Sequence, residues 1–99
     1  MNWMDATTYS QGQRGKVAQT AWSADIGGKR IWVSCGHRDF PDAWVMRFGT
    51  VIEGPLEIGK KDKMNSDEAR KNAVETAWDY VRQEIATLGS IEANLQEAM

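Results

Sequence analysis

The sequence is poor in the residues that build covalent and metal cross-links. Its 99 residues include a single cysteine, Cys35, and a single histidine, His37. One cysteine cannot form an internal disulfide, and one cysteine with one histidine cannot supply the four ligands of a structural zinc site. We therefore expect no metal, no cofactor and a reducing, cytoplasmic setting.

Long hydrophobic runs are also missing. No stretch reaches the roughly 18 apolar residues of a membrane span, and the first residues, "MNWMDATTYSQGQRGK", are not apolar. Positive charge is in short supply as well, since the formal net charge is −2. Residues 1–50 carry six Lys/Arg against four Asp/Glu, and residues 51–99 carry six against ten. The lack of apolar runs argues against a membrane protein and a secreted protein, and the charge balance argues against a dedicated duplex-DNA binder.

The first two thirds of the chain predict strands. Residues 1–16 have no clear period and are expected to form an N-terminal arm, followed by a single domain over residues 17–99. The runs 17–25 and 30–35 flank Gly27 and Gly28, which is typical of a β-hairpin. A loop at 36–43, a third strand at 44–53 with Gly49 as a bulge, and a short edge strand at 55–58 complete the pattern.

The last third of the chain predicts a long helix over 66–88. Asn65 and Glu68 have the spacing of a capping box, and Gly89 is expected to end the helix before a short last helix capped by Ser90. Apolar residues recur every three or four positions on one face, namely Val74, Trp78, Val81, Ile85 and Leu88.

Together these elements predict an α+β fold: a three- to four-stranded antiparallel sheet with one long C-terminal helix packed on one face. The apolar helix face is expected to pack on alternate strand residues, namely Ile31, Val33, Trp44, Met46 and Phe48.

The opposite sheet face is the candidate functional surface. It is expected to carry Trp32, Arg30 and Arg47, with Trp22 as a further candidate and His37, Arg38 and Phe40 at the rim. An exposed tryptophan beside arginines suits two uses, stacking on an unpaired base or anchoring a protein interface. Two alternatives stay open: Trp3 with the N-terminal arm, or the C-terminal tail, covers this face, or the face is a homodimer seam.

Catalytic chemistry has little support. Cys35 and His37 are two residues apart, so a thiolate–imidazolium pair is conceivable. However, Cys35 falls on the apolar phase of its strand, and no oxyanion donor is identifiable. We therefore predict no catalytic residues and no enzymatic activity.

The predicted helix opens with "SDEARKNA", and "FPD" lies upstream at residues 40–42. In Glu68, Ala69, Asn72 and Ala73 this opening resembles the HicB-type antitoxins, in which a small sheet precedes such a helix. The chain departs from that pattern because more than twenty residues separate "FPD" from the helix and no DNA-binding segment follows. In size, mild acidity and lack of catalytic motifs it also resembles small accessory proteins of phages and mobile elements, such as anti-CRISPR inhibitors. Both resemblances imply a compact domain that acts by occupying the surface of another macromolecule.

The sequence thus predicts a non-enzymatic binding protein that neutralises or regulates a protein or ribonucleoprotein partner through the aromatic and arginine-bearing sheet face, as a phage-encoded inhibitor of a bacterial defence complex would. The alternative is a single-stranded nucleic-acid-binding module that uses the same face with help from Lys60, Lys61 and Lys63.

Overall fold

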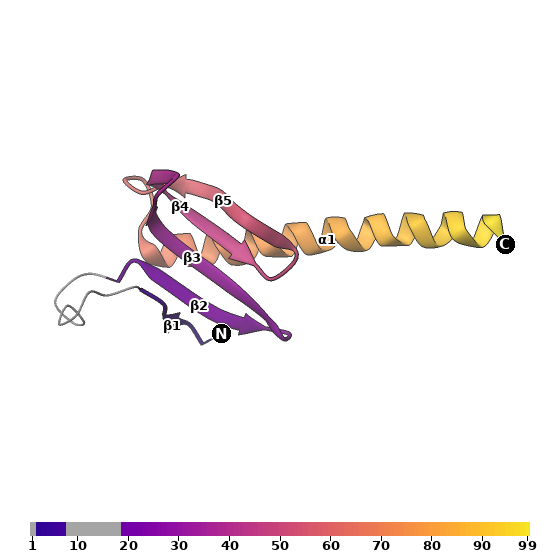
Figure 1. The fold of residues 1–99 in the computed structure, drawn as a ribbon, viewed down its shortest axis with the longest axis horizontal. Helices are drawn as coiled ribbons and strands as arrows, with labels where there is room; N and C mark the ends of the chain where they lie inside the picture. Colours follow the sequence, from indigo (N-terminus) through magenta and orange to yellow (C-terminus); the bar gives the residue numbers. More distant parts are fainter. Residues whose placement is uncertain (1, 8–18) are drawn as a thin grey trace.

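The chain forms one antiparallel sheet and one long helix (Figure 1). The computed structural model describes residues 2–7 and 19–99. Within these residues the strands neighbour one another in chain order, each antiparallel to the next. The elements are β1 (Met4–Asp5), β2 (Ala21–Ile26), β3 (Lys29–His37), β4 (Phe40–Phe48), β5 (Ile52–Lys60) and α1 (Ser66–Ala98). The predicted α+β class is confirmed, and the described residues form five strands where the sequence predicts three to four.

The β2–β3 hairpin follows from its two glycines. Gly27 and Gly28 have φ values of 56° and 83°, a backbone region that costs residues with a Cβ atom free energy. Positive φ at both central residues is the requirement of the two-residue turn whose twist matches that of the flanking strands. The hairpin predicted at this position is therefore confirmed.

The bounds of the remaining strands differ from those that the sequence predicts. The predicted third strand at 44–53 starts earlier and ends at Phe48, and Ile52 and Glu53 belong to β5. The expected loop at 36–43 shrinks to a turn at Arg38 and Asp39, since β3 runs to His37 and β4 starts at Phe40. Gly49 is not a bulge within a strand: with φ 49° it lies in the turn between β4 and β5. The expected edge strand at 55–58 is part of the nine-residue β5, which tolerates Pro55 because it is an edge strand.

Part of the predicted N-terminal arm belongs to the sheet. Met4 and Asp5 pair with Ser23 and Trp22 of β2, which makes β1 the edge opposite β5. Trp3 is partly buried against the hydrophobic core. Residue 1 and residues 8–16 of the predicted arm, and its predicted boundary with the domain, lie outside the described residues.

The core lies between the sheet and the start of α1. The five strand residues expected there are all buried, from Ile31 and Val33 at 0% exposure to Phe48 at 6%. Trp22 belongs to the same core: it lies opposite Val33, is 6% exposed, and its ring centroid is 5.8 Å from that of Trp44. The prediction that Trp22 lies on the face away from the helix is therefore wrong. The cause is the pairing register of β2, which its own sequence does not determine.

The start of α1 is fixed as predicted. The Glu68 backbone N–H donates to Asn65 Oδ1 (2.9 Å), and the Asn65 backbone N–H donates to Glu68 Oε1 (3.2 Å), which forms the capping box. Two further bonds tie this end of the helix to the sheet. Trp44 Nε1 donates to the Met64 carbonyl (2.8 Å), and Asn72 Nδ2 donates to the Ile58 carbonyl (2.8 Å).

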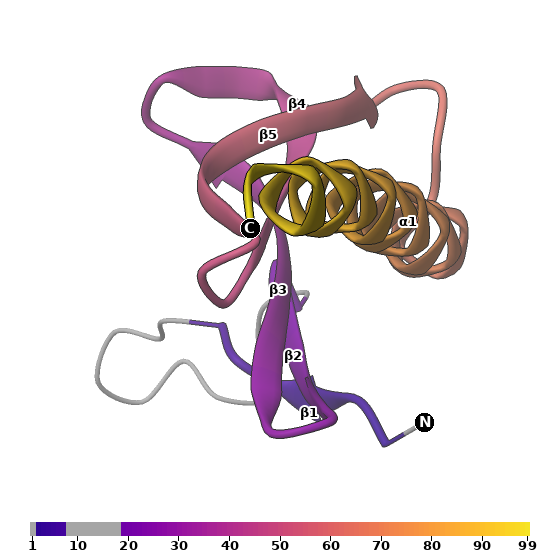
Figure 2. The same ribbon diagram turned by 90° about the vertical axis from the view of Figure 1, so that its right-hand side faces the viewer.

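The helix face that meets the sheet differs from the predicted one. The buried helix residues are Ala69, Ala73 and Ala77, one per turn, whereas Trp78 is 64% exposed. Ile85 and Leu88 are also exposed, so the larger part of the predicted apolar face does not contact the sheet. Because alanine is small, the helix axis can approach the strands closely, and Figure 2 shows the β4–β5 end of the sheet curling over α1.

The helix also runs further than expected. Gly89 does not end it, no separate helix starts at Ser90, and α1 continues to Ala98. From Arg82 onward every residue is exposed. The C-terminal half of α1 therefore projects beyond the sheet (Figure 1), and the longest dimension of the molecule is 62 Å.

Candidate functional site

Trp32 lies on the sheet face away from the helix. Its neighbours along β3, Ile31 and Val33, are buried in the core on the other side, and side chains alternate along a strand. Arg47 lies directly across from Trp32 on β4. The guanidinium carbons of Arg30 and Arg47 lie 5.9 Å and 5.6 Å from the Trp32 ring centroid. The structure thus brings together the three residues that lead the predicted site, with the indole in cation–π contact with both arginines.

The two arginines differ in how they are held. Arg30 donates to the hydroxyl of Ser23 (3.0 Å) and to Asp25 Oδ2 (3.0 Å), which fixes its guanidinium beside the indole. Ser23 is 2% exposed, so Arg30 also satisfies a buried hydroxyl. Arg47 is exposed and makes no ion pair with any residue that the structure describes. Arg47 is therefore the cation of this face that is available to a carboxylate from outside.

The surface around Trp32 is hollowed, with a volume of about 480 Å³. Val45, which is 3% exposed, forms the apolar floor of the hollow. Glu53 and Pro55 of β5 line one side of it, and Thr20 and Ala21 line the other. We call this surface, together with Arg30, the Trp32 face; its main side chains are Arg30, Trp32, Ser34, His37, Val45, Arg47, Glu53 and Pro55. An apolar floor with a few charged groups at its edge is the usual composition of a recognition surface.

Of the described N-terminal residues, Ala6 lines the hollow beside Thr20 and Ala21, whereas Trp3 lies elsewhere. Trp3 packs against the core beside the helix, where it lines a hollow with Arg70 and Val74. The C-terminal half of α1 projects away from the sheet (Figure 1). Trp3 and the C-terminal half of α1, the two described segments that the sequence leaves open as covers, therefore do not lie over Trp32.

The predicted rim residues divide into two groups. His37 lines the far end of the hollow, five residues along β3 from Trp32, or roughly 16 Å at the rise of a strand. Its Nδ1 accepts the backbone N–H of Asp39 (3.1 Å), and its ring centroid is 5.8 Å from that of Phe40. Arg38, 93% exposed, pairs with Asp39 at 3.9 Å. Neither Arg38 nor Phe40 lines the hollow.

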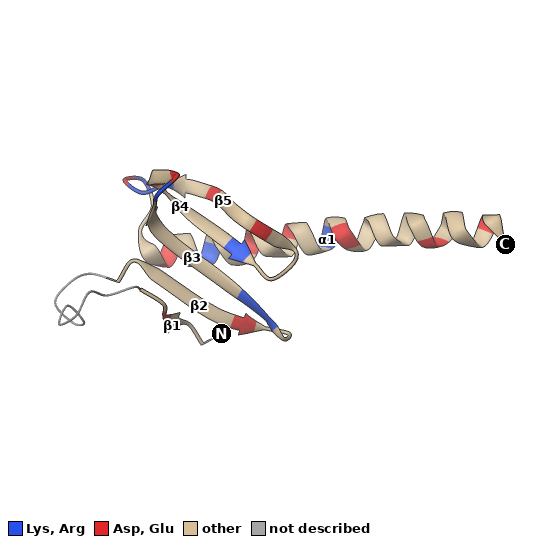
Figure 3. Ribbon diagram, viewed as in Figure 1, with Lys and Arg blue, Asp and Glu red and all other residues tan. Residues whose placement is uncertain are grey.

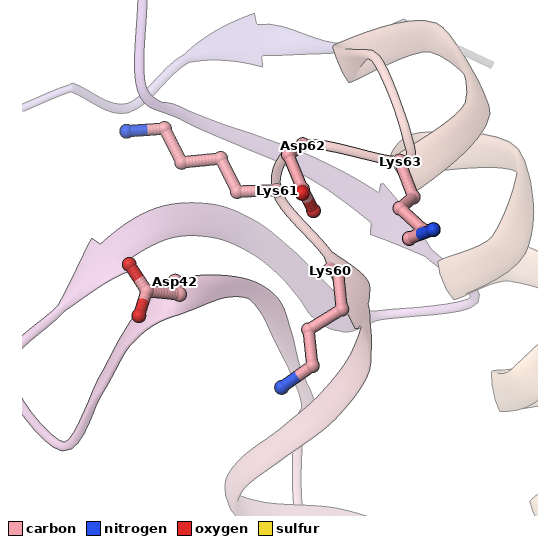
Figure 4. Close-up of a pocket in the computed structure, with 5 residues that line it drawn as sticks. All are labelled: Asp42, Lys60, Lys61, Asp62 and Lys63. Atoms are coloured by element: carbon pink, nitrogen blue, oxygen red, sulfur yellow. The ribbon is translucent and has the colours of Figure 1, made fainter.

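The lysines of the nucleic-acid alternative lie elsewhere. Lys60, Lys61 and Lys63 line a separate hollow of about 700 Å³ with Asp42 and Asp62 (Figure 4), which shares no residue with the Trp32 hollow. Their amines point in different directions in that view. Figure 3 shows the same separation: one group of basic residues lies in the loop before α1, and another at the adjoining ends of β3 and β4. The structure therefore does not bring these lysines to Trp32.

Cys35 and His37 do not form a pair. Cys35 is partly buried and packs against the core, whereas His37 contacts Asp39 and Phe40. Among the described residues, no group of three or more His, Cys, Asp and Glu side chains is arranged to hold a metal ion. In that same part of the chain, no helix combines the length and apolar character needed to cross a bilayer.

Sequence reasoning missed four residues of the Trp32 face, namely Ser34, Val45, Glu53 and Pro55. Glu53 and Pro55 come from β5: the sequence predicts Glu53 at the end of the third strand and Pro55 at the start of the short edge strand, and no signal in the sequence places them beside Trp32. Val45 could have been found, because it shares the strand phase of Arg47. Comparisons of the chain with protein-family models, with curated proteins and with solved structures gave no match.

Proposed function

We propose that this protein is a non-enzymatic binding protein whose Trp32 face docks onto a partner protein. The observation that carries the proposal is the Trp32 indole in cation–π contact with two guanidiniums beside the apolar floor of a hollow. Tryptophan and arginine dominate the energetics of protein interfaces, because they bury a large area and lose little freedom when neighbours already hold them. Arg30, bonded to Ser23 and Asp25, is held in this way.

The charges favour a protein partner over single-stranded nucleic acid. Phosphate backbones are bound by several cations along one track. The Trp32 face offers Arg47, while Arg30 is already paired with Asp25, and Glu53 adds a negative charge. The three lysines that would extend a track lie in the other hollow. A complementary partner surface would present an apolar or aromatic side chain for Trp32 and a carboxylate for Arg47.

Binding of this kind alters a partner by occupying its surface. We therefore extend the proposal to the regulation or neutralisation of a protein or ribonucleoprotein complex. The resemblance in build to small phage accessory inhibitors motivates this extension, and an inhibitor of a bacterial defence complex is the form of it that we propose.

The experiment is affinity capture from bacterial lysate with three tagged proteins: the wild type, Trp32→Ala and Trp78→Ala, each with and without nuclease. Trp78→Ala is the matched control, because it removes a more exposed tryptophan from α1, away from the Trp32 face. We expect a protein that the wild type and Trp78→Ala retain, that Trp32→Ala loses, and that nuclease does not release. Equal retention by Trp32→Ala would contradict the proposal, and complete release by nuclease would favour the nucleic-acid alternative.

A further inference from the structure

Helix α1 carries an exposed apolar stripe that starts at Trp78 and continues along its projecting half. Trp78 is 64% exposed, Ile85 63%, Leu88 55% and Leu95 61%. Soluble proteins rarely expose large apolar side chains in one contiguous row unless the row is a contact surface. The members of this row, which we call the α1 stripe, are Trp78, Val81, Ile85, Leu88, Leu95 and Met99.

The stripe has the spacing of a coiled coil. Val74, Val81, Leu88 and Leu95 recur every seven residues, and a second series of Trp78, Ile85, Glu92 and Met99 lies four residues after each of them. Alternating steps of four and three residues form the a and d positions of a heptad, the seam along which two helices pair. Glu92 is the one charged residue in the seam.

We propose that the α1 stripe pairs with the same stripe of a second copy of this chain, as an antiparallel two-stranded coiled coil. The orientation follows from Glu92. In a parallel pair each Glu92 would face the Glu92 of the other copy, which places two like charges in the seam. In an antiparallel pair centred between Ile85 and Leu88, Glu92 lies opposite Val81 of the second copy and beside its Arg82. The Glu92 carboxylate of each copy then lies beside the Arg82 guanidinium of the other copy.

The same register completes the two ends of the seam. Trp78 lies opposite Leu95 of the second copy, so a large side chain meets a smaller one. Val74 lies opposite Met99 of the second copy, at the hollow of about 550 Å³ that Trp3 and Val74 line. The Met99 side chain, which is 99% exposed in the single chain, would enter that hollow.

The area is sufficient for a stable dimer. Val81 is partly buried against the core, and the other five stripe side chains are each more than half exposed. Together they would bury about 700 Å² per copy, close to the roughly 800 Å² per partner of a standard interface. Pairing would also support the helix itself. The segment beyond Val81 has no sheet contact and contains Gly89, and an isolated helix of that length is marginal in water.

The test is sedimentation equilibrium of the full chain over about 1 to 100 µM, because self-association depends on protein concentration. We expect the wild type to be a dimer and Leu88→Glu to associate roughly 100-fold more weakly, since each dimer would bury two new carboxylates. Gln83→Glu is the matched control: it adds the same carboxylate on the far side of α1 and should leave the dimer intact. Neither residue contacts the sheet, so near-UV circular dichroism at a concentration where all three proteins are monomeric should show an unchanged fold for both variants. A monomeric wild type, or equal association by Leu88→Glu, would overturn the proposal.

A charge exchange tests the orientation. Glu92→Arg should weaken the dimer about 5- to 10-fold, and adding Arg82→Glu should restore it to within about twofold, because an antiparallel pair re-forms both ion pairs. In a parallel pair the two introduced arginines would still face each other, so failure to restore would overturn the antiparallel arrangement. This seam does not involve the Trp32 face, so either proposal can fail without the other.

Discussion

Ala73→Leu should destabilise the protein more than any comparable change on the exposed part of α1. Ala73 is 0% exposed and faces the sheet, together with Ala69 and Ala77. Leucine adds three carbons where the helix approaches the strands closely, and overpacking of this kind costs about 1 to 3 kcal/mol. In a domain of this size that corresponds to a midpoint roughly 5 to 20 °C lower.

The assay is thermal unfolding followed by circular dichroism, with Ala86→Leu as the control. Ala86 is exposed on the same helix, so the same substitution there changes neither packing nor helix propensity appreciably. Trp78→Ala tests the exposed face of the same helix. At a concentration where the chain is monomeric, it should lower the free energy of unfolding by less than about 1 kcal/mol, whereas loss of a core tryptophan costs roughly 3 to 5 kcal/mol. Equal midpoints for the two leucine variants, or a large loss for Trp78→Ala, would refute the alanine-faced packing.

Three further substitutions test other parts of the account. Trp32→Ala should lower the free energy of unfolding by about 1 to 2 kcal/mol, because it removes two cation–π contacts and cross-strand packing. Trp44→Ala, in the core, should lower it by about 3 to 5 kcal/mol. Urea titrations measure both losses, and equal losses would place Trp32 in the core. Asn65→Ala should cost about 1 kcal/mol through loss of the capping box, and Asn94→Ala, exposed within the same helix, much less; chemical denaturation of the two variants checks the difference. Gly28→Ala should lower the thermal midpoint by several degrees, since alanine at φ 83° is strained by roughly 1 kcal/mol or more; an unchanged midpoint would contradict the turn geometry.

The local elements could largely be predicted from the sequence. Strict alternation in β3 separates Ile31 and Val33 from Trp32, and this pattern alone assigns them to opposite sheet faces. The glycine pair fixes the first hairpin and Asn65 fixes the start of α1, because each is a local requirement of the backbone. The three leading residues of the Trp32 face could be predicted for the same reason.

The predictions are wrong where two apolar patterns share the same spacing, or where the pairing register of a strand determines which sheet face a residue occupies. Both the alanine series from Ala69 to Ala77 and the heptad of apolar residues have helical spacing, and a larger side chain is the usual guide to the buried face. Here close approach to the sheet favours the alanines, which leaves the larger residues exposed. Trp22 was misplaced because its face depends on pairing with Val33. β5 is longer than the predicted edge strand because Gly54 and Gly59 are typical of turns, although an edge strand tolerates them.

The most direct test of the central claim is a calorimetric titration of the captured partner into the wild type and Trp32→Ala, at two salt concentrations. The account predicts that Trp32→Ala, with its fold intact, weakens binding by about 30-fold or more, and that the wild-type affinity changes little with salt. An unchanged affinity for Trp32→Ala, or a steep loss of wild-type affinity with salt, would contradict a protein-docking role for the Trp32 face.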